Sequence, residues 1–133
     1  MPVMELRVAL TVDEFDRVVA FYRDGLGLDP GDIWTDHGNG QIFYAGRGTL
    51  EIFDPAHADA VDRLEVGARV SGMIRFAFEV PDVYAALERA QDYGATLVHA
   101  PVLTPWGHLN ARVQSPEGLQ ITLYQVMGDA ASG

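Results

Sequence analysis

The chain contains no cysteine and no lysine, and arginine supplies all nine of its basic residues. The lack of cysteine excludes disulfides, thiolate nucleophiles and cysteine-ligated metals. The lack of lysine excludes Schiff-base chemistry and phosphate-binding loops that depend on a lysine. No apolar run approaches the roughly 20 residues of a membrane-spanning helix, and the first residues lack the features of an export signal. The sequence therefore predicts a cytoplasmic protein without a membrane partner.

Composition and charge indicate a globular domain that handles a small molecule. The chain has 133 residues, of which 48% are hydrophobic, and this is enough to bury one core. Its net charge of −10 would repel a phosphate backbone, and no local cluster of basic residues offsets that charge. We therefore expect no nucleic-acid partner.

The first part of the chain shows the pattern of a strand, a helix and three further strands. Hydrophobic residues alternate with others over residues 4–12, which is typical of a strand with two different faces. Asp13 is the expected N-cap of a helix that ends at Gly25 or Gly27. Short strands joined by glycine-containing turns are then predicted at residues 32–36, 41–46 and 49–53.

The same order of elements repeats in the second part of the chain. A strand is predicted at residues 73–80, followed by a helix that Asp82 caps and Gly94 ends. The two predicted caps are separated by the same number of residues as Gly25 and Gly94, which indicates a duplicated module. Three further strands are predicted at residues 96–102, 107–114 and 119–126.

We therefore predict an α+β fold with a single domain over residues 1–133. It consists of two βαβββ modules, at about 4–53 and 73–126. We expect them to form one domain because one module alone would bury too little surface. The linker, residues 54–72, is expected to hold a short helix that ends near Gly67. Its acidic stretch is expected to be a solvated surface.

Four segments carry a resemblance to a known family. They are FYRDGLGL at residues 21–28, FAFEVPDV at 76–83, and PWG at 105–107 followed by SPEGLQI at 115–121. In this order they resemble the vicinal oxygen chelate superfamily, which contains glyoxalase I, bleomycin-resistance proteins and extradiol dioxygenases. The resemblance implies paired modules whose sheets form a cup around a ligand, and it implies a homodimer.

The resemblance also implies four positions at which metal-dependent members place their ligands, one in the first and last strand of each module. Here those positions hold Arg7, Glu51, Arg75 and Thr122. An arginine keeps its proton and offers no lone pair, and one carboxylate does not hold a transition metal. We therefore expect neither a metal nor another cofactor.

Two interpretations of this centre remain open. In the first, Glu51 is ion-paired between Arg7 and Arg75, and one arginine keeps spare donors for an anionic or carbonyl-bearing ligand. In the second, the same residues form a structural salt-bridge network that binds nothing. The flanking arginines are expected to lower the pKa of Glu51.

Aromatic and histidine side chains supply the remaining candidate contacts. Ligand pockets are mostly apolar with a few polar groups, and the aromatic candidates are Trp34, Phe43, Phe53, Trp106 and Tyr124. Alternatively, most of these aromatic side chains belong to the hydrophobic core and contact no ligand. His108 either faces the cup, as a proton acceptor or hydrogen-bond donor, or lies on a solvated rim.

Two functions from different classes follow. The first is a metal-independent protein of the bleomycin-resistance kind that sequesters an apolar or aromatic metabolite or drug. The second is a glyoxalase-like lyase or isomerase, with Glu51 as general base and Arg7 or Arg75 stabilising an oxyanion. A metal-dependent dioxygenase is a further alternative if the strand register differs. The expected ligand-binding residues of the first function are Arg7, Arg75, Trp106, His108, Thr122, Tyr124, Phe53 and Trp34.

Overall fold

A computed structural model describes residues 2–127 as eight strands, three α-helices and one π-helical turn. No helix in this range is both long and apolar enough to cross a membrane. In chain order the elements are β1 (Glu5–Thr11), α1 (Phe15–Ala20), η1 (Phe21–Gly25), β2 (Asp29–Trp34), β3 (Gly40–Ala45), β4 (Gly48–Phe53), α2 (Pro55–Val66), β5 (Ile74–Glu79), α3 (Val83–Asp92), β6 (Thr96–Leu103), β7 (His108–Gln114) and β8 (Gln120–Val126).

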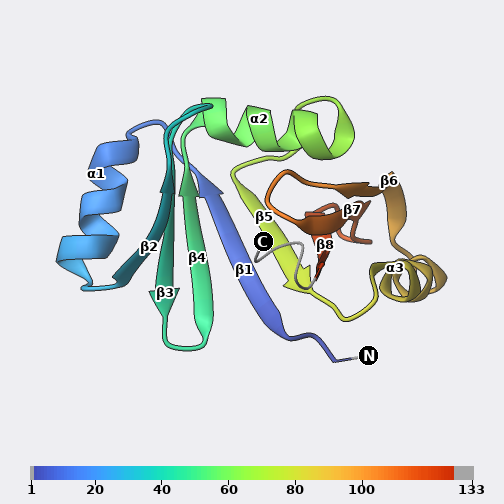
Figure 1. Cartoon of the computed structure of the whole chain (residues 1–133). Helices are drawn as coiled ribbons and strands as arrows, with labels where there is room; N and C mark the ends of the chain where they lie inside the picture. Colours follow the sequence, from blue (N-terminus) through green and yellow to red (C-terminus); the bar gives the residue numbers. More distant parts are fainter. Residues whose placement is uncertain (1, 128–133) are drawn as a thin grey trace.

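All eight strands form one curled sheet in the order β2-β3-β4-β1-β5-β8-β7-β6. At its centre β1 and β5 lie antiparallel, and each runs parallel to the last strand of its own βαβββ unit, β4 or β8. Figure 1 shows α1 beside one end of the sheet and α3 beside the other. The predicted α+β fold, with two βαβββ units in one cup-shaped sheet, is confirmed.

The predicted strands begin and end within one residue of the observed ones, except for β2. That strand begins earlier than expected because its pairing with β3 is irregular between Pro30 and Ile33, which breaks the alternation of side chains. The π-helical turn after α1 also follows no signal that we identified in the sequence.

The two predicted helix caps have different outcomes. Asp82 caps α3, and its carboxylate accepts hydrogen bonds from the backbone N–H groups of Tyr84 and Ala85. Asp13 does not cap α1, so that prediction is wrong. Glu14 occupies the N-cap position instead and makes no side-chain cap bond.

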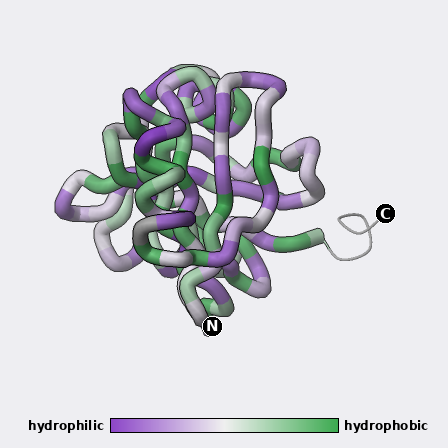
Figure 2. Tube along the Cα trace, turned by 90° about the vertical axis from the view of Figure 1, so that its left-hand side faces the viewer, coloured by the Kyte–Doolittle hydropathy of each residue, from purple (hydrophilic) through white to green (hydrophobic). Residues whose placement is uncertain are grey.

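Two helices cover the outer face of the sheet. Successive strand residues point to opposite faces, so the register decides what each helix meets. On α1, Val19 joins Phe43 and Ile52 in a buried cluster. On α3, Val83 and Leu87 form a second cluster with β7 and β8. The tube in Figure 2 changes repeatedly between hydrophilic and hydrophobic residues along its length, as two-faced strands require.

The third helix, α2, covers the inner face. It lies across the end of the cup at which β1 and β4 terminate (Figure 1). Ala58 and Val61 on this helix pack against Ala9 and Phe53 on the inner face of the sheet. The helix ends at Gly67, as predicted, with the positive φ of 86° that glycine adopts readily.

Charged residues of α2 turn into the cup and meet Arg112, whose side chain is completely buried. Its guanidinium donates to Asp62 at 3.0 Å and to Glu65 at 2.8 Å. The expectation of a solvated acidic surface is therefore wrong for these two residues. Both are buried because Arg112 supplies the counter-charge, and Asp62 also accepts the backbone N–H groups of Val70 and Ser71.

Replacing Arg112 by leucine tests this network. We expect Arg112→Leu to lower the free energy of unfolding by about 3–5 kcal/mol, because two buried carboxylates lose their partner. Urea unfolding at pH 7.5 measures the change. The matched control is Arg63→Leu on the same helix, where Arg63 pairs with Asp59 in solvent and the expected change is below about 1 kcal/mol. Equal losses in the two variants would contradict the role of Arg112.

Candidate functional site

The strand register brings the four family positions together on the inner face of the central strands. Ala9 on β1 lies between Glu51 on β4 and Arg75 on β5. Ala77 on β5 lies in the same way between Arg7 and Thr122. Because alanine is small, the long side chains on either side have room above the sheet. We call the end of the cup under α2 the covered end, and the end that carries Glu5 and Tyr124 the open end.

Arg7 lies between the two ends and is only partly satisfied. Its Nε atom donates to Glu5 at 3.0 Å and to the hydroxyl of Tyr124 at 3.2 Å. Its Nη1 atom lies 4.0 Å from Oε2 of Glu51, which is too long for a hydrogen bond. Among residues 2–127, the two terminal nitrogens have no hydrogen-bond acceptor. Arg7 therefore keeps donors for another molecule.

Glu51 is buried, with 7% of its surface exposed, and it accepts no hydrogen bond from residues 2–127. Burial raises the pKa of Glu51, and Glu65 and Glu5 add to that rise, although Arg75 and Arg7 oppose it. The expected lowering of the pKa is therefore wrong. The cost of removing the carboxylate from water is larger than its attraction to two guanidiniums that do not hydrogen-bond to it.

Arg75 does not form the predicted close ion pair with Glu51. Its Nη1 atom donates to the hydroxyl of Thr122 at 2.8 Å, and its Cζ atom lies 6.0 Å from the centre of the Phe53 ring. Thr122 in turn donates to Glu65 at 2.9 Å. At the covered end the family positions therefore belong to the buried network that α2 completes.

Glu5 gathers the polar groups of the open end. It accepts hydrogen bonds from Arg7, from the hydroxyl of Thr49 and from the hydroxyl of Tyr124. Partial burial would raise the pKa of Glu5, but the bonds from Thr49 and Tyr124 and the charge of Arg7 lower it overall. The pKa of Glu5 is therefore lowered, whereas that of Glu51 is raised.

Two side chains lie against the ring of Tyr124. His108 stacks on it with ring centres 5.0 Å apart, and Cζ of Arg7 lies 5.4 Å from the ring centre. Burial raises the pKa of Tyr124, and the hydrogen bond to Glu5 adds to the rise. Burial lowers the pKa of His108, and so does the charge of Arg7. His108 thus lies in the cup, half-buried and uncharged near neutral pH.

The other aromatic candidates fall into separate places. Trp34 stacks on His57 under the start of α2, and Phe53 meets the edge of the same imidazole. Phe43 is completely buried on the outer face and does not reach the cup. Trp106 is 43% exposed and lies at the rim, 6.4 Å from His108.

The side chains at the four family positions are poor ligands for a metal cation. Two are guanidiniums without lone pairs, and the Thr122 hydroxyl accepts from both Arg75 and Arg112. Glu51 alone offers an anionic oxygen, whereas transition metals need three or four good ligands. Across residues 2–127, no group of three or more histidine, aspartate or glutamate side chains is arranged to hold a metal.

Sequence reasoning did not select the residues that close the covered end. Asn110 and Arg112 lie on β7 with the same facing as His108, so strand alternation could have found them. Asp62 and Glu65 lie in the linker, where no strand pattern applies. Asn110 donates to Glu65 at 3.1 Å, and among residues 2–127 its Oδ1 atom is the one buried side-chain oxygen without a partner.

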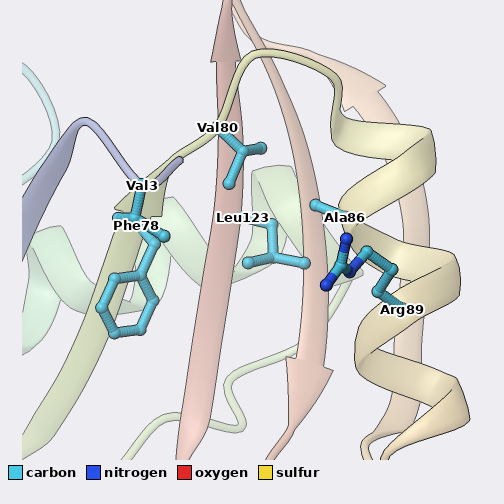
Figure 3. Close-up of a pocket in the computed structure, with 6 residues that line it drawn as sticks. All are labelled: Val3, Phe78, Val80, Ala86, Arg89 and Leu123. Carbon is cyan, nitrogen blue, oxygen red and sulfur yellow. The ribbon is translucent and has the colours of Figure 1, made fainter. Parts of the chain in front are cut away.

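Two surface hollows lie outside the cup. One, of about 230 Å³, lies on the outer face beside α3 (Figure 3) and is lined by Val3, Phe78, Val80, Ala86, Arg89 and Leu123. The other, of about 470 Å³, lies near the start of α1 and is lined mainly by polar residues of segments 13–17, 39 and 54. Neither brings an acid, a base and free donors together as the cup does.

Comparison with known families agrees with this geometry. The sequence profile of the Glyoxalase/Bleomycin resistance protein/Dioxygenase superfamily matches residues 6–123. The chain belongs to this superfamily. Among curated proteins, no relative matches the chain significantly.

Solved structures share the fold at low sequence identity. Methylmalonyl-CoA epimerase from Mycobacterium tuberculosis has 17% identity and a TM-score of 0.71, covering 98% of this chain and 93% of that chain. A glyoxalase/bleomycin resistance protein/dioxygenase superfamily member from Vibrio splendidus has 13% identity and a TM-score of 0.69, covering 91% and 97%. Hypothetical protein BH1468 from Bacillus halodurans has 16% identity and a TM-score of 0.66, covering 90% and 91%. At these identities the likeness establishes the fold alone.

The contrast between Glu51 and Glu5 gives a pH-dependent prediction. The folded state binds a proton at Glu51 more tightly than the unfolded state, so this residue costs stability as pH rises above the ordinary glutamate value of 4.5. Glutamine copies the protonated form. We expect Glu51→Gln to be more stable than the wild type at pH 8, and to lose this advantage near pH 5.

The matched control is Glu5→Gln, which should change stability in the opposite direction. The pKa of Glu5 is lowered in the folded state, so its charge adds stability above the ordinary value and loses it as pH falls. Urea unfolding at pH 5 and pH 8 separates the two. A loss of stability in Glu51→Gln at pH 8 would contradict the raised pKa.

Proposed function

We propose that this chain is a metal-independent small-molecule binding protein whose ligand is held by Arg7 in the cup. One observation carries the proposal. Arg7 is half-buried beside Glu51, and among residues 2–127 its terminal nitrogens have no acceptor. A partly desolvated guanidinium in this state gains strong hydrogen bonds from a carbonyl or carboxylate oxygen that a ligand supplies.

The ligand would enter from the open end. At the covered end α2 packs on Phe53. There the hydroxyl of Thr122 already donates its hydrogen bond to Glu65. Towards the open end, the side chains of Arg7 and Glu5 keep 24% and 22% of their surface exposed. A molecule can therefore reach Arg7 without displacing α2.

The body of the ligand would be apolar or aromatic. Tyr44 and Val126 are both exposed, and their strand pairing places them on the inner face, with Thr49 and His108 as their partners. Trp106 extends this surface at the rim. Apolar walls around a few polar groups are the usual composition of a small-molecule pocket. In this proposal the ends of β3 and β8 and Trp106 would form the wall, and Phe53 and Trp34, which contact His57 under α2, would not.

Elemental analysis tests the metal-independent part of the proposal. Protein purified without an affinity tag or chelator should contain well below one transition metal per chain, because the donor set is poor. Added Zn²⁺, Mn²⁺ or Ni²⁺ should leave the melting temperature unchanged in a thermal-shift assay. About one metal per chain, or a clear stabilisation by one of these ions, would contradict the proposal.

A homodimer is part of the proposal, from the family resemblance. Leu6 and Ile74 lie on the outer face of the two central strands and are both exposed, so they offer an apolar surface for a second copy. Light scattering after size-exclusion chromatography distinguishes a dimer from the monomer of 14.5 kDa.

A second candidate function is proton transfer, and the raised pKa of Glu51 favours it. The ionised carboxylate would take a proton from the carbon next to a carbonyl group, and Arg7 would stabilise the enolate oxygen that forms. Returning the proton to another position or to the other face would complete an isomerisation. A carboxylate with a raised pKa is a stronger base than an ordinary one. The flanking arginines, which were expected to weaken Glu51 as a base by lowering its pKa, therefore do not count against this function.

Deuterium exchange tests this second function. Phenylpyruvate and acetoacetate in D₂O are followed by ¹H NMR with the wild type and with Glu51→Gln. If the chain catalyses enolisation, exchange should slow by about 100-fold or more in the variant. Equal exchange rates with the two proteins would show that Glu51 is not a general base for these substrates.

A further inference from the structure

We infer that the cup recognises an uncharged group in which a hydrogen-bond acceptor stands next to a donor, as in a primary carboxamide or a lactam. The acceptor oxygen would bind the terminal nitrogens of Arg7, and the adjacent N–H would donate to the carboxylate of Glu51. This inference rests on the proposed function and specifies the chemistry of the ligand's polar head.

The first support is the pairing of an unused donor with an unused acceptor. Nη1 of Arg7 and Oε2 of Glu51 lie 4.0 Å apart and do not hydrogen-bond to each other. Neither has another hydrogen-bond partner among residues 2–127. They are not sealed from solvent either, because the one sealed side-chain atom without a partner in that range belongs to Asn110. The pair is open to a molecule that supplies both complements.

The second support is the charge of the cup. Its buried and half-buried ionic groups contain one carboxylate more than guanidiniums: Arg7, Arg69, Arg75 and Arg112 face Glu5, Glu51, Asp62, Glu65 and Glu79. Burial lowers the pKa of His108 and of His57, so these residues add no positive charge near pH 7.5. A further anion would enter an already negative centre of low polarity, which is unfavourable.

The third support is the cost of leaving Glu51 unpaired. A ketone satisfies Arg7 but offers Glu51 no donor, and a carboxylate adds its charge beside that of Glu51. A buried polar group that a ligand covers without supplying a partner discriminates strongly between similar ligands. An amide satisfies both groups, and it does so whether Glu51 is ionised or protonated, because either form retains an acceptor oxygen.

Three ligands of nearly equal shape test the inference. Benzamide offers an acceptor and a donor, acetophenone offers the acceptor alone, and benzoate offers two acceptors with a negative charge. Their dissociation constants are measured at pH 7.5 by ¹⁵N chemical-shift titration, which includes the indole of Trp106. We expect benzamide to bind at least about tenfold more tightly than either of the others. The smaller lactam 2-pyrrolidinone is added so that size does not decide the result.

Substitutions of Glu51 and Arg7 test which residue causes the preference for benzamide. Glu51→Met should bring benzamide and acetophenone to equal affinity, because the acceptor is gone. Arg7→Met should weaken both, because the shared carbonyl contact is lost. The controls are Glu117→Met and Arg47→Met in exposed turns, which change charge equally and should leave all affinities unaltered.

The outcomes separate this inference from the proposed function. If acetophenone or benzoate binds as tightly as benzamide, and Arg7→Met weakens them, the head group is wrong while the cup remains a ligand site. If benzamide and 2-pyrrolidinone show no saturable binding at 20 mM, the inference is also overturned. If Arg7→Met leaves every affinity unchanged, the ligands bind elsewhere and the proposed function fails as well.

Discussion

A guanidinium without exposed surface must be neutralised where it lies, and at Arg112 this requirement orders the rest of the cup. Arg112 holds Glu65 of α2 against the inner face, and Glu65 also accepts a hydrogen bond from the hydroxyl of Thr122. That hydroxyl accepts in turn from Arg75, which is thereby turned away from Glu51. A single buried charge thus determines which end of the cup is covered. It also explains why Glu51 keeps an unsatisfied carboxylate although two arginines are near it.

The two arginines at the family positions also join the modules. Arg7 of the first module lies over Tyr124 of the second, and Arg75 of the second lies over Phe53 of the first. Contacts between a cation and an aromatic face are worth about 0.5–2 kcal/mol, more where water is excluded. The backbone pairing of β1 with β5 closes the seam from within the sheet, and these two contacts reinforce it from the inner face. In metal-dependent members of the family, as the resemblance implies, a metal connects the same four strands.

Patterns of period two were enough to predict the sheet, because each strand alternates between a helix-covered face and the cup. The same patterns placed Arg7, Glu51, Arg75 and Thr122 on one face, and the register agrees. They could not predict what opposes that face. The inward turn of α2 depends on a partner 45 or more residues away in the chain, as the bonds to β7 show. The pKa of Glu51 likewise depends on depth below the surface, which no local pattern contains.

The two modules repeat one order of elements, yet their arginines do not have equivalent surroundings. The helix that covers Arg75 lies in the linker between the modules, a segment that belongs to neither repeat. Strand geometry alone would give the cup two related places for a ligand, one beside each arginine. The linker helix places the chain's own carboxylates, Asp62 and Glu65, at the end of the cup beside Arg75, where a ligand would otherwise lie. On the proposed function, the connection between the repeats, and not the repeats themselves, would therefore leave one place per chain for a ligand.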